Sequence, residues 1–442
     1  MLDAVSHSRP LSEGVSRRSL LHTGLAGILG LSLPDLLRLQ ANGAEAGRKR
    51  EASVIFVELA GGPTQHETYD PKPNAPLEYR GPLAAIETSL PGEYFSELMV
   101  QQARVADKLA VIRSITHDSG SHSTSAHLTQ TGYYLRNPQN RENEMPSAGS
   151  ITARLRGSSE SGVPAYVSIP NSTRFGRAAW MSRAYNPFET VNNGDVDNFQ
   201  VPNLTLNQGL TGNRLDDRRT LLTAFDGARK QVDNQGVADA MDQFTRQAFE
   251  LVTGPAARKA FNLASEDPRI RAKYGLNATG QNLLLARRLV EHGVPFVTVR
   301  VNGWDDHGKI AQAMKAKGPA YDQGVAALVE DLYSRGLDKQ VLMVCIGEFG
   351  RTPRVNASAG RDHWGQVMSV VISGGGLRTG QIIGSSDRHG ATPLTRPYRP
   401  ENVLAMIYRH LEIDTTASFT DNSGRPRFVL ERRELITELI SS

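Results

Sequence analysis

Short runs of almost continuous apolar residues alternate along the chain with longer segments whose apolar positions recur at helical spacing. The runs at 52–59, 109–115 and 165–170 ("ASVIFVEL", "LAVIRSI", "AYVSIP") are typical of strands buried on both faces. Residues 280–301 and 320–350 each read as a helix that ends near a glycine and is followed by a strand. This alternation predicts a mostly parallel central sheet covered by helices on both faces, a three-layer α/β/α sandwich.

Further segments extend the same pattern. Residues 94–109 and 124–135 have apolar positions at helical spacing, and 400–411 reads as a closing helix. The last apolar run lies at 365–376, before a glycine-rich turn. Residues 216–264 are charged, poor in glycine and helix-forming, so we interpret them as a helical insertion.

The N-terminal segment differs from the rest of the chain. Arg17 and Arg18 precede a moderately apolar stretch, and the small-residue pattern Ala44-x-Ala46 follows it. This order predicts an export signal, and the paired arginines resemble a twin-arginine signal. Proline and polar residues interrupt the apolar stretch, which argues against a membrane-spanning helix. An amphipathic N-terminal helix of the mature domain is the alternative.

The chain is therefore expected to consist of a signal peptide, 1–46, and one α/β domain, 47–442, because no linker rich in proline, serine and glycine divides the second part. The mature chain is expected to begin near Gly47. We expect the twin-arginine export machinery as a partner, a periplasmic or secreted location, and no stable membrane span.

Charge and cysteine content narrow the possible functions. The 442 residues carry 50 basic and 46 acidic side chains, a net charge of +4, and the basic residues form no stripe. Because phosphate tracking needs clustered lysine and arginine, no nucleic-acid partner is expected. Cys345 is the single cysteine, so no intrachain disulfide can form. Its place within an apolar run predicts a buried, unreactive thiol.

Polar side chains follow four of the predicted strands at their carboxyl ends. In chain order these are Thr64, His66 and Asp70; His117, Asp118, His122 and His127; Asp305, Asp306 and His307; and Glu348, Arg351, Asp362 and His363. Ligands of parallel α/β sheets bind beyond the carboxyl ends of the strands, so these loops are expected to meet. The alternative is that each Asp–His pair is a surface turn with a hydrogen-bonded imidazole.

A divalent metal ion suits these side chains. Imidazole and carboxylate without thiolate favour Zn, Mn or Ca. Asp305 and His307 lie two residues apart and can face one side of an extended loop, and His363 can complete a three-ligand site with an open position. Glu348 is expected to bind this ion or a second one.

Other side chains are expected to bind the substrate. Arg351 has the fork geometry that holds an anionic ester through two hydrogen bonds. Thr64, His66 and Asp362 are expected to border the same cavity. The segment 347–364 is therefore interpreted as part of a metal and oxyanion site.

Several motifs together resemble one family. They are "VIFVELAGGPTQHETYDPK", "AVIRS", "TGYY", "GWDDH", "GEFGRTP" and "GRDHW", and they run through nearly all of the chain after the signal segment. The set resembles the family called domain of unknown function 1501, which is considered similar in fold to the alkaline phosphatase and sulfatase superfamily. The resemblance implies an alkaline phosphatase-like sandwich and metal-dependent hydrolysis of phosphate or sulfate esters.

The sequence departs from that superfamily at the nucleophile and at two metal-binding positions. Sulfatases carry the nucleophile ten positions before the glycine of a Thr-Gly pair, and counting back from Gly132 reaches His122. The aspartate after the first strand is replaced by Ala60-Gly61-Gly62, and the later Asp-His-Gly loop aligns with Glu348-Phe349-Gly350. These departures favour one metal ion or none over a two-metal centre.

Two functions follow from these patterns. The first is an exported metal-dependent hydrolase of a small-molecule or glycan sulfate or phosphate ester. In it, His122 acts as nucleophile or general base, and Arg351 neutralises charge on the transferred group. The second is a non-catalytic exported protein that keeps a degenerate site and binds glycans or takes part in surface assembly. A stoichiometric divalent ion distinguishes the first from the second.

Overall fold

The structure is a computed structural model that describes residues 52–157, 162–190 and 255–440. Contacts divide the chain into two units, Met1–Arg50 and Glu51–Ser442. The predicted signal peptide, 1–46, lies outside the described residues, as does the predicted helical insertion up to residue 254. The architecture below is that of the second unit.

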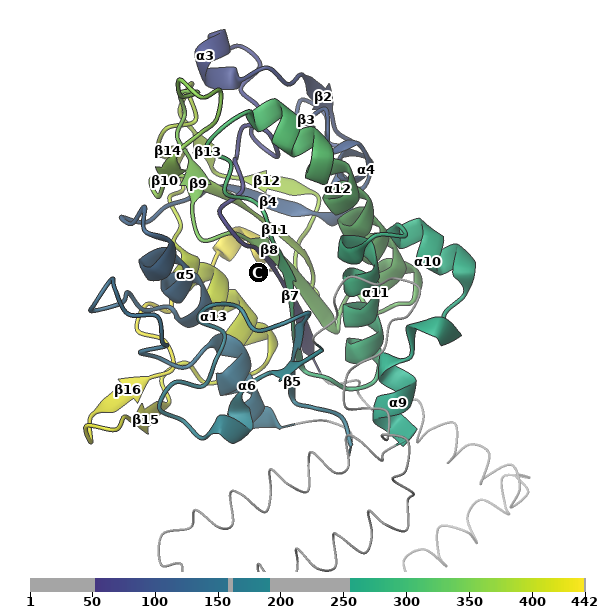
Figure 1. Ribbon diagram of the computed structural model, residues 1–442, viewed down its shortest axis with the longest axis vertical. Helices are drawn as coiled ribbons and strands as arrows, with labels where there is room; N and C mark the ends of the chain where they lie inside the picture. Colours follow the sequence, from purple (N-terminus) through teal and green to yellow (C-terminus); the bar gives the residue numbers. More distant parts are fainter. Residues whose placement is uncertain (1–51, 158–161, 191–254, 441–442) are drawn as a thin grey trace, which may run out of the picture. The chain divides into compact units, whose positions relative to one another are not determined.

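A sheet of eight strands forms the centre of this unit, in the order β12-β4-β11-β8-β1-β7-β5-β6 (Figure 1). The strands are β1 (Ser53–Leu59), β4 (Ala110–Ile115), β5 (Tyr166–Ile169), β6 (Phe188–Glu189), β7 (Phe296–Val301), β8 (Val341–Ile346), β11 (Met368–Gly374) and β12 (Gln381–Ile383). β11 is antiparallel to both β8 and β4, whereas the remaining neighbours are parallel. The prediction of a mostly parallel sheet is confirmed.

Helices cover both faces of the sheet, as predicted. Figure 1 shows α10, α11 and α12 on one side and α5, α6 and α13 on the other. The helices are α3 (Leu77–Arg80), α4 (Val100–Arg104), α5 (His122–Thr131), α6 (Ala148–Arg156), α9 (Pro255–Phe261), α10 (Pro268–Tyr274), α11 (Ala278–Glu291), α12 (Ile310–Ser334) and α13 (Pro400–His410). Short antiparallel pairs complete the described part: β2 (Ala85–Glu87) with β3 (Tyr94–Ser96), β9 (Gly350–Arg351) with β10 (His363–Trp364), β13 (Ser385–Ser386) with β14 (Pro393–Thr395), and β15 (Ser418–Thr420) with β16 (Pro426–Phe428).

The continuous apolar run of β1 fills two separate cores. Because side chains alternate along a strand, Ile55 and Val57 belong to the core under α11 and α12, whereas Val54 and Phe56 belong to the core under α6 and α13. All four side chains are buried. Burial on both faces is what the uninterrupted apolar pattern predicted.

Two elements differ from the sequence prediction. Residues 94–109 were expected to be helical, but Tyr94–Ser96 form β3 and helix begins only at Val100. Aromatic residues favour a pleated strand, and Phe95 is fully buried opposite Ile86. α12 begins ten residues before the predicted segment and contains Pro319, a residue type that usually ends a helix.

No helix within the described ranges is both long enough and apolar enough to cross a bilayer.

Glu58 is a buried carboxyl within β1. Its Oε1 accepts a hydrogen bond from Gln130 on α5 at 3.3 Å, and Nε of Arg300 lies 3.6 Å from Oε2, beyond hydrogen-bond distance. Burial and the nearby charge of Glu348 raise the pKa of Glu58 to about 8, and the opposing effects of Arg300 and Gln130 are smaller. The folded protein therefore holds a proton that the unfolded chain releases.

This carboxyl predicts a stability that falls as the pH rises. The folded state binds the extra proton between the ordinary glutamate pKa of 4.5 and a pH of about 8, so the free energy of unfolding decreases through that window. In Glu58→Gln, the decrease in the free energy of unfolding should be smaller by up to about 1.4 kcal/mol per pH unit. The measurement is urea unfolding with chelator present, and the control is Glu87→Gln, at the exposed last residue of β2. If the free energy of unfolding changes with pH by the same amount in wild type and in Glu58→Gln, the prediction is wrong.

Candidate metal centre

Four loops that carry the predicted polar residues meet at one edge of the sheet. β1, β7 and β8 are parallel, and β4 runs in the same direction because β11 is antiparallel to both β4 and β8. Their carboxyl ends therefore lie at the same edge. The loop after β4 leads into α5, whose first residue is His122. The loop after β7 carries Asp305 and His307, and the loop after β8 carries Glu348 and His363.

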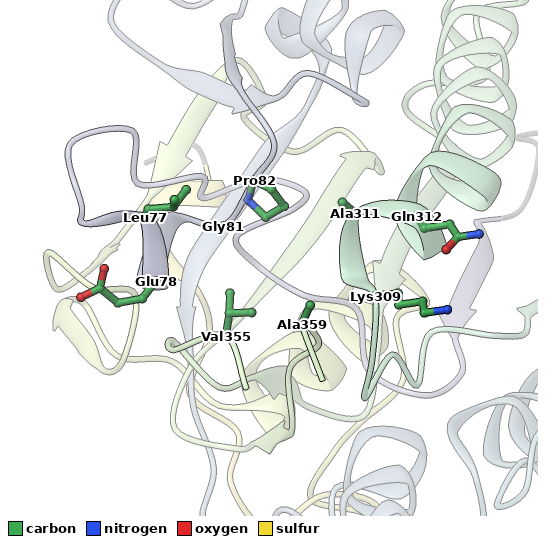
Figure 2. Close-up of a pocket in the computed structure, with 9 residues that line it drawn as sticks. All are labelled: Leu77, Glu78, Gly81, Pro82, Lys309, Ala311, Gln312, Val355 and Ala359. Atoms are coloured by element: carbon green, nitrogen blue, oxygen red, sulfur yellow. The ribbon is translucent and has the colours of Figure 1, made fainter. Parts of the chain in front are cut away.

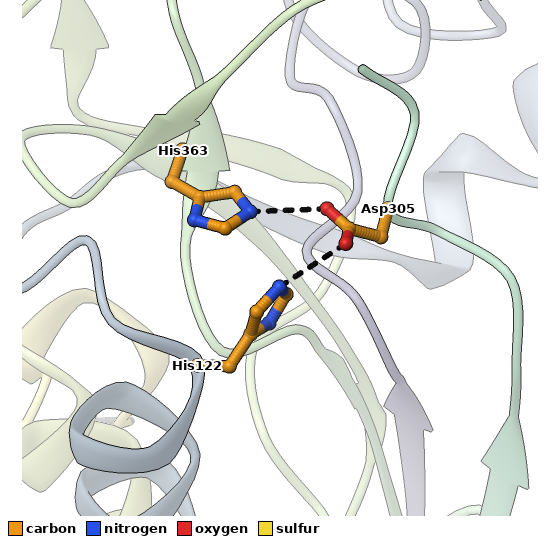
Figure 3. A group of neighbouring side chains, drawn as sticks. All are labelled: His122, Asp305 and His363. Atoms are coloured by element: carbon orange, nitrogen blue, oxygen red, sulfur yellow. Dashed lines mark hydrogen bonds and ion pairs between the residues drawn. The ribbon is translucent and has the colours of Figure 1, made fainter. Parts of the chain in front are cut away.

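Three histidines surround the carboxylate of Asp305, and Figure 3 shows two of them, His122 and His363. Its Oδ1 lies 3.0 Å from Nε2 of both His307 and His363, and its Oδ2 lies 3.2 Å from Nε2 of His122. The Nε2 atoms of His307 and His363 are 3.0 Å apart. Since all four side chains are partly exposed, a ligand can reach them from solvent.

Each of the three histidine rings has a hydrogen-bond acceptor at its Nδ1 atom. Nδ1 of His122 faces a carboxylate oxygen of Glu348 at 2.8 Å, and Nδ1 of His307 faces one of Asp362 at 2.8 Å. Nδ1 of His363 faces the carbonyl of Gly120 at 2.9 Å. These oxygens only accept hydrogen bonds, so each Nδ1 donates; a ring in its neutral form then presents an Nε2 lone pair, whereas a protonated ring also donates from Nε2 to Asp305. Metal-binding histidines are held in the same way.

Lone pairs at these distances repel one another unless a cation or additional protons lie among them. Asp305 Oδ1 and the Nε2 atoms of His307 and His363 form a triangle with sides of 3.0 Å. All three corners can lie about 2.1 Å from one point above the triangle, the usual length of a zinc bond to nitrogen or oxygen. Within the described residues, His122, Asp305 and His363 also form a candidate ligand group with atoms within 4.8 Å of one another. These residues therefore fit a divalent ion.

The local charges act differently on the members of the centre: they favour the ionised carboxylate of Asp305, the protonated ring of His122 and the neutral ring of His363. Burial opposes ionisation of Asp305, but the hydrogen bonds from Arg351 and His363 and the charges of Arg351 and His122 together outweigh it and hold the pKa of this carboxyl well below its usual range. The hydrogen bond to Glu348 raises the pKa of His122 above its usual value, against the effect of burial. Burial lowers the pKa of His363, which keeps this ring neutral.

Glu348 lies behind His122 and supports its ring. Both of its carboxylate oxygens accept from the backbone N–H of Gly61, at 2.9 and 3.0 Å, and Oε1 also accepts from His122. Its side chain is 8% exposed. The sequence suggested a metal ligand, whereas these contacts make Glu348 an orienting residue.

Arg351 is enclosed beneath the centre rather than facing a cavity as expected. It is fully buried, and its donors reach five oxygens. Four are carbonyl oxygens, and the fifth is Oδ1 of Asp305 at 2.6 Å from Nη2. Since its donors are engaged, Arg351 positions Asp305 and does not bind an anionic ester in this arrangement.

The three predicted substrate-binding residues also lie elsewhere than expected. Thr64 donates to the buried Glu67 at 2.5 Å, and Nε2 of His66 lies 2.8 Å from the carbonyl of His389. Thr64 and His66 are 2% and 1% exposed, so neither can contact a substrate here. Burial lowers the pKa of His66 to about 4, which leaves its ring neutral. Asp362 is exposed and orients His307.

Two glycines to which the sequence analysis gave no supporting role complete the arrangement. The carbonyl of Gly120 holds His363, and the N–H of Gly61 holds Glu348. Gly61 has a φ of +117°, and a Cβ there would lie 2.5 Å from the backbone nitrogen of Asp305. A side chain is therefore excluded at this position. The Gly-Gly pair directly after the first predicted strand was the signal for this close approach.

A separate cavity of about 610 Å³ lies beside the loop that carries His307 (Figure 2). Its lining is mostly apolar: Leu77, Glu78, Gly81, Pro82, Lys309, Ala311, Gln312, Val355 and Ala359. The histidines of the centre are not part of this lining.

Comparison with known proteins gives a family and distant structural similarities. A family described as protein of unknown function (DUF1501) matches residues 51–440. No curated protein matches the chain in sequence. Solved structures with a similar arrangement include Ps i-CgsB (11% identity, TM-score 0.40, 82% of this chain and 73% of that one) and the PsFucS1 sulfatase from Pseudoalteromonas sp. (13%, 0.37, 86% and 70%). The lipoteichoic acid synthase LtaP from Listeria monocytogenes is another (7%, 0.33, 83% and 73%). At these scores they supply no residue role and no substrate for the present chain.

The burial of Arg351 predicts a structural role that lysine cannot fill. A lysine ammonium has three donors and cannot reach the five oxygens around the guanidinium. Arg351→Lys should lower the free energy of unfolding by roughly 3 kcal/mol, because polar groups stay buried without partners. Chemical denaturation measures the loss. The control is Arg396→Lys, at a side chain that is 59% exposed. Equal stability of the two variants would show that Arg351 is dispensable for the fold.

Proposed function

The chain belongs to the DUF1501 family, whose description names no activity, and from its own side chains we propose that it is a metal-dependent hydrolase of sulfate or phosphate esters. The observation that carries the proposal is the convergence of three Nε2 atoms on one carboxylate at the carboxyl edge of the sheet. Asp305, His307 and His363 are the residues that would hold the ion. Bound there, a divalent ion supplies Lewis acidity to an ester oxygen and to water.

His122 supplies the proton acceptor in this proposal. Nδ1 of His122 donates a hydrogen bond to Glu348, so Nε2, which lies 3.2 Å from Oδ2 of Asp305, is the ring nitrogen that accepts a proton from an attacking water. The raised pKa of His122 strengthens this acceptor. Asp305 reaches both the ligand set, through Oδ1, and His122, through Oδ2. A water between these groups would therefore lie beside its base.

The second candidate is a non-catalytic protein that binds a glycan through a degenerate site. The enclosed Arg351 favours it, because the cationic clamp expected for an anionic ester is engaged by the protein itself. Inactive protein that binds a sulfated polysaccharide, with affinity unchanged in His122→Ala, would support this candidate over the enzyme.

Metal content and activity together test the hydrolase. Native protein should contain about one divalent ion per chain by elemental mass spectrometry. His307→Ala should lose the ion because it removes a ligand. His122→Ala should keep the ion and lose about 10²–10⁴-fold in kcat, the usual contribution of a general base.

His292→Ala is the matched control, since His292 caps the carboxyl end of α11 and bonds to the carbonyl of Arg288. It should keep both the ion and the activity. Native protein that contains no divalent ion would rule the mechanism out.

We also propose export through the twin-arginine route, on the basis of Arg17, Arg18 and the Ala44-x-Ala46 pattern. The full chain expressed in a Gram-negative host should reach the periplasm with a new N-terminus near Gly47. Replacing both arginines by lysine should retain it in the cytoplasm, whereas Arg9→Lys should not. Cell fractionation gives the location, and N-terminal mass spectrometry gives the new N-terminus. A double-lysine variant that still reaches the periplasm would exclude this route.

A further inference from the structure

The apolar cavity beside the loop that carries His307 has the size and the lining of a ligand site. Its volume of about 610 Å³ lies within the range of small-molecule sites, roughly 300–1,000 Å³. We infer that it binds a small amphiphilic anion, a molecule with an aromatic or aliphatic body and one anionic group at its end. None of the histidines of the metal centre belongs to the lining, so this site is separate from that centre and goes beyond the proposed function.

Two apolar walls face each other across the cavity. Figure 2 shows Leu77 and Pro82 on one side, and Val355 and Ala359 on the other. Ala311, at the start of α12, also lines the cavity. Leu77 is 60% exposed, so a ligand body that packs against it removes apolar surface from water. This burial is the main source of affinity for a ligand with an apolar body.

Backbone hydrogen bonds hold the segments that form these walls. The N–H of Val355 donates to the carbonyl of Glu78 at 2.8 Å, which joins the turn after β9 to α3. The N–H of Ile310 donates to the carbonyl of Ala359 at 2.8 Å, which joins the same turn to the start of α12. All three lining segments are therefore connected to one another. A ligand does not have to order the chain around it, which lowers the cost of binding.

The polar side chains of the lining give the ligand a direction. Figure 2 shows Lys309 and Gln312 at one end of the cavity and Glu78 at the other. All three side chains are exposed, and none has a hydrogen-bond or ion-pair partner among the described residues. The ammonium of Lys309 and the amide N–H of Gln312 can both donate to an anionic group. The carboxylate of Glu78 repels such a group, so the anionic end of the ligand is expected beside Lys309.

This lining suits an amphiphilic anion better than a sugar or a polyanion. A sugar needs many hydrogen bonds for its hydroxyl groups, whereas six of the nine lining residues have no polar side chain. A polyanion needs several cations, whereas Lys309 is the one cationic side chain of this lining. One charge at the end of an apolar body therefore matches the lining in both number and position.

Calorimetry on the full chain tests the inference with three probes. 6-Phenylhexanoate carries both the apolar body and the anionic group, 6-phenylhexanamide lacks the charge, and acetate lacks the body. Phenylhexanoate should bind about threefold or more tighter than the amide, the size expected for one exposed ion pair. It should bind at least about tenfold tighter than acetate, because the apolar body supplies most of the affinity. If phenylhexanoate does not bind, or binds no tighter than either other probe, the inference is overturned.

The same titrations in the presence of a chelator separate this site from the metal centre. The affinity for phenylhexanoate should stay the same, because the lining shares no residue with the centre. Loss of binding with chelator would assign the anion to the bound ion and overturn the inference. If the protein hydrolyses no ester, the proposed function fails, and these titrations still decide whether the cavity binds the probe.

Variants that fill the cavity locate the bound probe. Val355→Trp and Ala311→Trp each add an indole to the lining, from two different segments, and circular dichroism checks that each variant folds. A folded variant should bind phenylhexanoate at least about tenfold more weakly, one unit in log Kd, because the indole occupies the space. Leu276→Trp is the control, at a side chain that is 68% exposed and outside the lining. Unchanged affinity in a folded filled variant overturns the inference.

A charge-removing variant tests the anionic end without changing the walls. Lys309→Gln keeps part of the side-chain stem and removes the ammonium, so it should weaken phenylhexanoate by about threefold and leave the amide unchanged. Lys315→Gln is the matched control, because Lys315 is also exposed on α12 but lies outside the lining, and it should bind both probes as the wild type does. If Lys309→Gln changes neither probe, or changes both equally, the inference is overturned.

Discussion

The buried guanidinium of Arg351 is the interaction on which the centre depends. It joins loops that leave different strands, and its acceptors are the carbonyls of Gly61, Gly62, Trp304 and Arg361 and the carboxylate of Asp305. A planar group with donors in fixed directions sets the positions of several oxygens at once. Asp305 in turn is the carboxylate that the three histidines surround. Removing this one cation would leave the four carbonyls and Asp305 without their shared donor.

The histidines are held just as firmly from behind. Nδ1 of each ring donates a hydrogen bond to an oxygen of another residue: Glu348, Asp362 or Gly120. The side chains that the sequence suggested as ligand, clamp and substrate contacts mostly fill such supporting positions. The residues of the centre fit a cation, and in the proposed function its contacts with an anion come through that cation. This difference separates the site from the oxyanion clamp that the sequence suggested.

The sequence could predict that the loops meet at one edge of the sheet, but it could not predict the role of each side chain in the centre. Polar residues after 52–59 and 109–115 had to share an edge once these runs were recognised as strands of a mostly parallel sheet. Arg351 is different, because its partners are mainly carbonyls at separations of 10 to 290 residues, and a carbonyl leaves no mark in the sequence. Burial likewise cannot be read from the letters of Thr64 or His66. The strand at Tyr94–Ser96 was missed because helical spacing and aromatic content pointed in opposite directions.

The direction of β11 sets where the segment before it begins and ends. Because β11 is antiparallel to β8, residues 347–367 leave the sheet and return to it at the same edge. The segment carries Arg351, Asp362 and His363 between two anchored ends. Its outer turn around residues 354–359 includes exposed positions and can be lengthened or rewritten, whereas the buried Arg351 and Arg361 keep the rest of the segment in place. Related chains can thus diversify the entrance to the centre through a single continuous stretch, without redesigning the scaffold below.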